Sequence, residues 1–351
     1  MPSLVLDNIA TLVTCASPGG SRAGQAMSDV GVVRSAQVVI EGDRIAHVGA
    51  AGDTAAGNAV VIDCTGRTVL PGFVDSHTHI VHAGDRSDEF ARRLRGVTYQ
   101  EIAAEGGGIL STMRAVRASS VEQLVEHSRP FVQSAFAHGS TTIEAKSGYG
   151  LDLRSELNLL EAINAIGEEG PATLVPTFLG AHDIPPELRH DRESYVNAII
   201  EVMIPEVEAR GLAMFCDVFT DTGYFTVEES ERIFNAASAA GLRLKAHADE
   251  LSSFGAAEMS ARIGAVSADH LLCISDDGID QMNAAGVVAT LLPGTAFFLG
   301  LPYAPARRMI SEGMTVALAT DCNPGSNLCE NMQVTLALAC MGMRMSVEEA
   351  L

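Results

Sequence analysis

The stretch Leu70-Pro71-Gly72-Phe73-Val74-Asp75-Ser76-His77-Thr78-His79 marks the point where the pattern of the chain changes. It begins with a short apolar run and ends on two histidines. We expect a strand over residues 68–75, because the run is short and rich in strand-forming residues. Residues two apart on an extended segment point to the same side, so the imidazoles of His77 and His79 are expected to project together.

After residue 66, short apolar runs alternate with segments of helical length. The expected strands are residues 68–75, 140–145, 173–178, 214–219, 242–246, 266–269, 287–291 and 315–319. The expected helices are residues 120–138, 154–168, 192–210, 227–240, 254–263, 276–285 and 306–312. Apolar strands alternating with helices are typical of a parallel sheet with helical crossovers. Eight of them predict an α/β fold, a TIM-like (β/α)8 barrel over residues 67–351.

The first 66 residues have a different pattern, in which Val- and Ile-rich runs are separated by turn-forming residues. We expect strands over residues 4–14, 32–40, 44–48 and 59–64. Pro18-Gly19-Gly20 and Glu41-Gly42-Asp43 supply turns between them. These features predict a small N-terminal β-sandwich domain over residues 1–66, which is too small to be the catalytic core alone.

The composition argues against several classes of function. Hydrophobic residues make up 47% of the 351 residues and charged residues 19%, which favours a large core over disorder. The net charge is −21, so the chain does not suit a nucleic-acid backbone, and an anionic substrate needs a local cationic side chain. No uninterrupted apolar stretch is long enough to cross a membrane. We expect neither nucleic acid nor membrane as a partner.

The cysteines and the first residues predict a cytoplasmic protein. The seven cysteines are scattered, odd in number and without a C-x-x-C pair, which suits reduced thiols. The N-terminal residues lack the cationic start and the uninterrupted apolar run of a signal peptide.

Residues that can bind a metal follow several of the predicted barrel strands. His77 and His79 follow the first strand, and His247 and Asp321 each follow another. Barrel active sites are built at the C-terminal ends of the strands, so these four side chains are expected to meet. Three neutral imidazoles and a carboxylate suit Zn²⁺ or a similar ion that keeps a position open for water. An H-x-H pair alone is a weak signal, and two solvated loop histidines are its plainer interpretation.

Two more polar residues follow the same strands. Glu250, three residues after His247, is the predicted general base and then the acid to the leaving nitrogen. A solvent-facing glutamate at the start of a helix is its alternative. His270 could polarise a substrate carbonyl, although a hydrogen-bonded core histidine is the commoner case. Asp321 is predicted to bind the metal and also to move a proton.

Lys146 and Arg86 each allow two interpretations. A carbamylated lysine at a strand end can bridge two metals, but for Lys146 we favour an unmodified ammonium that is structural or faces the substrate. Arg86 could bind a substrate carboxylate through two parallel hydrogen bonds. An arginine on the surface is the alternative.

Stretches over nearly the whole chain resemble the amidohydrolase superfamily and, within it, the imidazolonepropionase family of histidine degradation. The H-x-H segment is common to many amidohydrolases, whereas several other stretches are more specific. The specific stretches are Lys146-Ser147-Gly148-Tyr149-Gly150, Phe178-Leu179-Gly180-Ala181-His182 and Thr320-Asp321-Cys322-Asn323-Pro324-Gly325-Ser326. Also matching are Gly84-Asp85-Arg86 with Glu89-Phe90, Gly106-Gly107-Gly108-Ile109, His247-Ala248-Asp249-Glu250, Ser267-Ala268-Asp269-His270 and Leu292-Pro293-Gly294-Thr295-Ala296-Phe297.

The resemblance implies hydrolysis of 4-imidazolone-5-propanoate to N-formimidoyl-L-glutamate with one Zn²⁺ or iron ion. It implies that His77, His79, His247 and Asp321 hold the ion, with Glu250 and His270 in the catalytic shell. The implied substrate contacts are Arg86, Tyr149, His182, Asn323, Gly325 and Ser326. Arg86 then pairs with the propanoate carboxylate. A homodimer is common among members of the family and is expected here.

One departure from the family concerns the end of the chain. Members of the family continue past a final barrel helix into strands that complete the small β domain, whereas this sequence stops at Glu348-Glu349-Ala350-Leu351. We therefore expect a truncated product or an incomplete gene, with the C-terminal strands of the sandwich missing and strand edges exposed.

Two other functions fit part of the pattern. A different amidohydrolase, such as a cytosine or guanine deaminase-like enzyme, keeps the metal ligands but does not need Arg86. A non-catalytic metal-binding or scaffold protein does not need Glu250.

Overall fold

The computed structural model describes residues 4–17, 19–53, 57–98, 101–102 and 105–351. The chain forms two compact units. One contains Met1–Gly72, Ser346–Glu349 and Leu351, and the other contains Phe73–Met345 and Ala350. The predicted domain boundary after residue 66 stays a prediction, because compactness does not show which part folds by itself.

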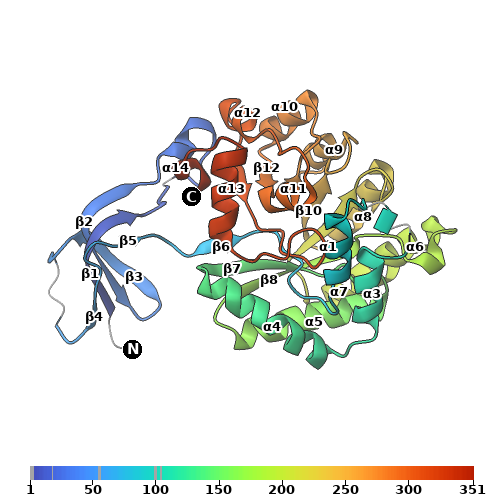
Figure 1. Ribbon diagram of the computed structural model, residues 1–351, viewed down its shortest axis with the longest axis horizontal. Coiled ribbons are helices and arrows are strands. Elements are labelled where there is room, and N and C mark those ends of the chain that lie inside the picture. The colour runs from blue at the N-terminus through green and yellow to red at the C-terminus, as the bar shows by residue number, and fades with distance from the viewer. Residues whose placement is uncertain (1–3, 18, 54–56, 99–100, 103–104) are drawn as a thin grey trace. The chain divides into compact units, whose positions relative to one another are not determined.

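The first unit is built on one mixed β-sheet, at the blue end of the chain in Figure 1. Its strands are β1 (Leu4–Val13), β2 (Val32–Glu41), β3 (Arg44–Ala50), β4 (Val60–Asp63) and β5 (Thr68–Val69). β2 pairs antiparallel with β1 and β3, whereas β4 and β5 pair parallel with β1. Ile9, Leu12, Ala36, Val38 and Cys64 form its buried core.

The second unit contains an eight-stranded parallel sheet in the order β13-β12-β11-β10-β9-β8-β7-β6. The strands are β6 (Phe73–Asp75), β7 (Ser140–Lys146), β8 (Thr173–Ala181), β9 (Phe215–Thr220), β10 (Arg243–Ala248), β11 (Ser267–His270), β12 (Val288–Leu291) and β13 (Val316–Leu318). Helices surround this sheet in Figure 1. The predicted (β/α)8 barrel is confirmed.

The helices follow the strands as the alternating pattern predicts. They are α1 (Ser87–Leu94), α3 (Ile109–Arg117), α4 (Val121–Ala137), α5 (Leu153–Glu169), α6 (Arg192–Ala198), α7 (Ile204–Ala209), α8 (Val227–Ala239), α9 (Ala256–Arg262), α10 (Asp276–Ala285), α11 (Pro293–Leu299), α12 (Ala306–Ser311), α13 (Met332–Gly342) and α14 (Val347–Ala350). Side chains cap several of them. Ser120 and Gln123 form a capping box before α4, as do Thr226 and Glu229 before α8.

The structure differs from the predicted elements in three ways. The single strand expected over residues 68–75 is wrong, because Pro71-Gly72 separates β5, which pairs with β1, from β6 in the barrel. The helix expected over residues 192–210 contains a π-helical segment, Ile199–Met203, just before Pro205. The helices α1, α3, α11 and α13 were not predicted.

Within the part of the chain that is described, no helix is both long enough and apolar enough to cross a bilayer.

Candidate active site

The first and last strands of the barrel meet where the predicted metal ligands lie. Asp321 N donates a hydrogen bond to His77 O at 2.9 Å, and His79 N donates to Cys322 O at 2.9 Å. One residue earlier in the chain, Thr320 donates two hydrogen bonds to the Asp75 carboxylate, from its N at 2.9 Å and from its Oγ1 at 2.6 Å. These hydrogen bonds at the ends of the first and last strands therefore hold the H-x-H segment next to Asp321, although the two are far apart in sequence.

The four predicted metal ligands lie close together and are buried. His77 Nε2 and His79 Nε2 lie 3.6 Å and 3.8 Å from Asp321 Oδ1, and His79 Nε2 lies 3.3 Å from His247 Nε2. Two ligand atoms about 2.0–2.1 Å from a tetrahedral zinc ion are roughly 3.3–3.4 Å apart, so these distances suit a shared ion. Among the described residues, His77 Nε2 has no hydrogen-bond partner. The donor set thus fits a metal.

His270 is close enough to belong to the same cluster. Its ligand atoms form a second potential metal-binding group with His77 and Asp321, beside the group of His77, His79 and His247. Burial lowers the pKa of His77, His79 and His270 well below the usual range. These imidazoles are therefore neutral, which is the form that binds a metal.

Two carboxylates and a hydroxyl contact the proposed metal ligands at the atoms that do not point toward the ion. Asp269 Oδ2 lies 2.6 Å from His77 Nδ1, and Asp217 Oδ2 lies 3.0 Å from His247 Nδ1. Thr295 Oγ1 donates a hydrogen bond to Asp321 Oδ2, which leaves Oδ1 toward the histidines. Partners of this kind fix the tautomer and orientation of a metal ligand. Sequence reasoning gave no role to Asp217, Asp269 or Thr295.

Lys146 and Lys245 balance these carboxylates inside the barrel. Lys146 Nζ lies 2.8 Å from Glu144 Oε1 and 2.7 Å from Asp217 Oδ2, and Lys245 Nζ lies 3.4 Å from Asp269 Oδ2. Burial alone would lower the pKa of Lys146, but Asp217 and Glu144 raise it. The structural ammonium that we favoured for Lys146 agrees with these contacts.

Glu250 lies beside His270 at the edge of the metal cluster. Its Oε2 is 3.6 Å from His270 Nδ1, too far for a hydrogen bond. Burial, with help from the nearby charges of Asp321 and Asp221, raises the pKa of Glu250 well above its usual range. A carboxyl whose pKa is raised in this way holds a proton more readily than an exposed glutamate, which suits a group that must accept a proton and return it.

Four non-glycine residues near these groups have a left-handed backbone. They are Asp249, His270, Leu271 and Asp321, with φ of 47°, 76°, 60° and 53°. Such conformations are unfavourable for L-residues and persist where surrounding contacts enforce them. For Asp249, these contacts are hydrogen bonds that its carboxylate accepts from the N–H groups of Phe254, Ala256 and Ala257.

Arg86 packs against the backbone of Gly325. A Cβ atom on Gly325 would lie 2.1 Å from Arg86 Nη1, so only glycine allows this approach. Arg86 Nε donates to Glu89 Oε2 at 2.8 Å, and Glu89 Oε1 accepts from Gly108 N at 3.0 Å. This chain of contacts holds a buried guanidinium at the wall of the cavity.

The remaining predicted substrate contacts lie on three segments, which follow β13, β7 and β8. Asn323 Oδ1 accepts hydrogen bonds from Gly325 N at 2.8 Å and Ser326 N at 2.7 Å, which shapes the first segment. Between the other two segments, His182 Nδ1 donates to Gly148 O at 3.0 Å, and the His182 ring stacks on His79 with centroids 4.8 Å apart. Burial lowers the pKa of His182 to about 3, so its Nε2 presents a lone pair.

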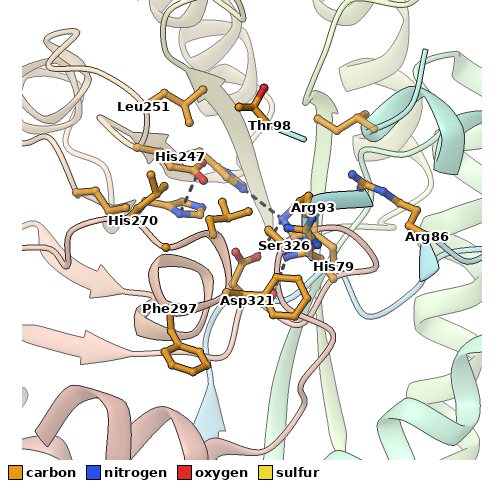
Figure 2. Close-up of a pocket in the computed structure, with 18 of the residues that line it drawn as sticks. His79, Arg86, Arg93, Thr98, His247, Leu251, His270, Phe297, Asp321 and Ser326 are labelled. Carbon is orange, nitrogen blue, oxygen red and sulfur yellow. Dashed lines mark hydrogen bonds and ion pairs between the residues drawn. The ribbon is translucent and has the colours of Figure 1, made fainter. Parts of the chain in front are cut away.

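Most of the predicted site residues line one cavity of about 820 Å³, but His77 and Gly325 are not among its lining residues. Figure 2 shows His79, His247, His270 and Asp321 turned toward one another, with Arg86 to one side and Phe297 to another. The cavity is also lined by Arg93, which sequence reasoning missed and which donates to Gly325 O at 2.8 Å. The predicted site residues that line the cavity are His79, Arg86, Tyr149, His182, His247, Glu250, His270, Asp321, Asn323 and Ser326.

Comparisons with known proteins agree with this arrangement. The model of the Amidohydrolase family matches residues 60–107. A curated imidazolonepropionase from Alkaliphilus metalliredigens is 44% identical over 99% of this chain and 84% of the relative. Another from Symbiobacterium thermophilum is 49% identical over 99% of this chain and 83% of the relative.

Two solved structures share the fold at low sequence identity. An atrazine chlorohydrolase from Arthrobacter aurescens complexed with zinc has a TM-score of 0.64 at 16% identity, over 97% of this chain and 76% of that one. An N-isopropylammelide isopropylaminohydrolase from Burkholderia multivorans has a TM-score of 0.69 at 18% identity, over 99% of this chain and 84% of that one.

Proposed function

The chain belongs to the imidazolonepropionase family of amidohydrolases, and from that premise we propose how its residues open the imidazolone ring. It is a metal-binding hydrolase that acts on a small molecule in histidine degradation. The reaction adds water to 4-imidazolone-5-propanoate, breaks the bond between the ring carbonyl carbon and a ring nitrogen, and gives N-formimidoyl-L-glutamate.

We propose that His77, His79, His247 and Asp321 hold one Zn²⁺ or iron ion. The spacing of their ligand atoms and the unpaired His77 Nε2 support this assignment. When bound, the ion supplies Lewis acidity that polarises the ring carbonyl and makes a water easier to deprotonate. Asp269 and Asp217 hold the imidazoles of His77 and His247 in the orientation that this binding needs.

Glu250 carries the proton in this proposal. It accepts a proton from the attacking water as oxygen bonds to the ring carbonyl carbon, and a tetrahedral intermediate forms. It then gives the proton to the ring nitrogen as the C–N bond breaks. Its pKa, raised by burial, suits both steps. His270 stabilises the charge that develops on the carbonyl oxygen, and Asp321 assists the movement of the proton.

The other polar residues orient the substrate. Arg86 binds the propanoate carboxylate, a task that a chain with a net charge of −21 must give to a local cation. The acceptor lone pair of His182 Nε2 suits an N–H group of the ring. Substrate contacts are also assigned to Tyr149, Asn323, Gly325 and Ser326.

The observation that carries this proposal is the clustering of four metal ligands, of which His79, His247 and Asp321 line one cavity together with Glu250 and Arg86. The test is to load the purified protein with Zn²⁺ or Fe²⁺, supply 4-imidazolone-5-propanoate and measure N-formimidoyl-L-glutamate, with bound metal quantified in parallel. A chelator should abolish turnover and added metal should restore it. Metal-loaded protein that leaves the ring intact would instead support a scaffold, and release of ammonia from cytosine or guanine would support a deaminase.

A homodimer in the cytoplasm completes the proposal. The scattered thiols support the location, and the dimer is what the resemblance to the family implies. Light scattering of the purified protein tests the oligomeric state, because a dimer has twice the chain mass of 36.8 kDa.

A further inference from the structure

One buried carboxylate beside the cavity has no part in the proposed mechanism. Glu156 lies in the first turns of α5 and is only 1% exposed. Its Oε1 accepts hydrogen bonds from Gly150 N at 2.7 Å and Leu151 N at 2.9 Å, and its Oε2 accepts from Gly148 N at 2.9 Å. Three backbone N–H groups of one short loop thus converge on this carboxylate.

The backbone of that loop needs such a partner. Gly148 has φ of 104° and Leu151 has φ of 54°, so the loop turns through conformations that are costly for most residues. These turns direct the N–H groups of Gly148, Gly150 and Leu151 toward one carboxylate, as in a backbone site for an anion. A Cβ on Gly150 would lie 2.6 Å from Glu156 N, so the loop packs directly on the helix. The carboxylate therefore fixes a shape that the loop does not favour by itself.

The same loop places two of the proposed substrate contacts. Tyr149 lies between the anchored residues and lines the cavity. Gly148 O of the same loop accepts the hydrogen bond from His182 Nδ1 at 3.0 Å. If the loop moved, Tyr149 would shift, and His182 would lose the partner that keeps its Nε2 lone pair toward the cavity.

We propose that Glu156 is a positioning residue of the substrate site, which holds Tyr149 and His182 in place through the backbone of residues 148–151. It does not touch the substrate, and it acts on binding more than on proton transfer. This inference rests on the proposed function, because it assumes that Tyr149 and His182 contact the substrate.

Arg117 supports the same loop from another direction. Its Nε donates to Gly150 O at 2.7 Å and its Nη2 donates to Leu151 O at 3.0 Å. Its Nη1 pairs with Glu187 Oε1 at 2.6 Å. Because its side chain is partly exposed, replacing Arg117 loosens the loop without creating a buried cavity.

The test compares Glu156→Gln with two matched variants of the same helix. Glutamine has a single acceptor oxygen. Its NH2 group is a hydrogen-bond donor, so at least one backbone N–H of the loop loses its acceptor. We expect KM for 4-imidazolone-5-propanoate to rise roughly ten-fold or more, with a smaller fall in kcat and unchanged metal content. Glu161→Gln makes the same chemical change on α5 away from the loop. Leu160→Ala creates a cavity at a fully buried position of α5, so it reproduces a loss of stability.

Binding is measured as well as turnover, with 3-(imidazol-4-yl)propanoate as a ligand that lacks the reactive carbonyl. Glu156→Gln should weaken its binding by a similar factor, and Arg117→Met should weaken it less. The proposal is overturned if Glu156→Gln binds the ligand as tightly as the original chain, or if Leu160→Ala raises KM equally at an equal loss of Tm. If Glu156→Gln does not fold, unchanged binding by Arg117→Met overturns it. Failure of the proposed function looks different, because the unmodified chain would then not open the ring.

Discussion

The N-terminal sheet and the barrel are stabilised in different ways. The sheet has a small apolar core around Ile9 and leaves Val60, Val61 and Ile62 of β4 about half exposed, at 56%, 49% and 46%. The barrel instead buries charged groups, such as Lys146 at 0% exposure, in a paired network behind the proposed metal ligands. A change in the barrel interior should therefore alter chemistry, whereas a change in the sheet should alter stability alone.

The largest expected effect comes from removing a metal ligand. His247→Ala leaves a cavity in place of an imidazole on β10, and the protein should bind less than a tenth of the original metal. The Lewis acid is worth several kcal/mol to the transition state, so kcat/KM should fall by about 10³-fold or more. The exposed His190 provides the control, since His190→Ala removes an imidazole elsewhere in the same unit. Full activity in His247→Ala would show that the barrel cluster is not the metal site.

Glu250→Gln should separate chemistry from metal binding. The amide keeps the size of the side chain but cannot accept and return a proton, so kcat should fall by about 10²–10⁴-fold while metal content stays unchanged. Elemental analysis and steady-state kinetics on the same preparation give both quantities. A variant that keeps its kcat would assign the proton transfer to another group, with Asp321 the next to test.

The next effect concerns recognition of the substrate carboxylate. Arg86→Ala removes a charge-assisted contact, so kcat/KM for 4-imidazolone-5-propanoate should fall roughly 10–100-fold. A substrate with a propyl group in place of the propanoate should be turned over at similar rates by Arg86→Ala and the original chain. If both substrates lose activity equally, Arg86 supports the loop at Gly325 instead of binding the carboxylate.

The positions of these residues could be predicted from the sequence to different extents. His77, His79, His247 and Asp321 follow apolar strands, and the geometry of a barrel brings the ends of its strands together. Sequence periodicity says nothing about which interior groups pair. The contacts of Asp217 with Lys146 and His247, and of Asp269 with His77, depend on strand register and on the closing of the barrel.

Two of the missed helices border the cavity, and each is hard to recognise in the sequence. The helix α1 is only eight residues long and four of them are charged, so its apolar face is reduced to Phe90, Ala91 and Leu94. In α11, Pro293 and Gly294 begin the helix, and a proline followed by a glycine usually indicates a turn. Proline is nevertheless favourable in the first turn of a helix, because its missing N–H would have no partner there. The position of Phe90, Arg93 and Phe297 on helices beside the cavity is therefore known only from the structure.

In the sheet, Ile9→Ala should change stability without changing chemistry. Ile9 is fully buried in the core of the sheet, and replacing isoleucine by alanine costs about 2–5 kcal/mol in comparable cores. We expect lower protection of β1 and β2 amides in hydrogen exchange, with kcat/KM unchanged within two-fold. Ile143→Ala, at a fully buried position of β7, is the matched change in the barrel and should lower both stability and kcat/KM. Equal loss of activity in the two variants would contradict the comparison.

The smallest effect uses a backbone feature that both units share. Ser35 in β2 has φ of 49°, close to the 53° of Asp321, but it is exposed and its conformation belongs to an irregular part of the sheet. Glycine adopts this conformation without strain, so Ser35→Gly should raise the free energy of unfolding of the sheet by up to about 1 kcal/mol. Ser35→Ala keeps the strain and should bring no gain. Denaturant melts of the two variants decide the point, because a loss of stability in Ser35→Gly would mean that the serine side chain stabilises β2.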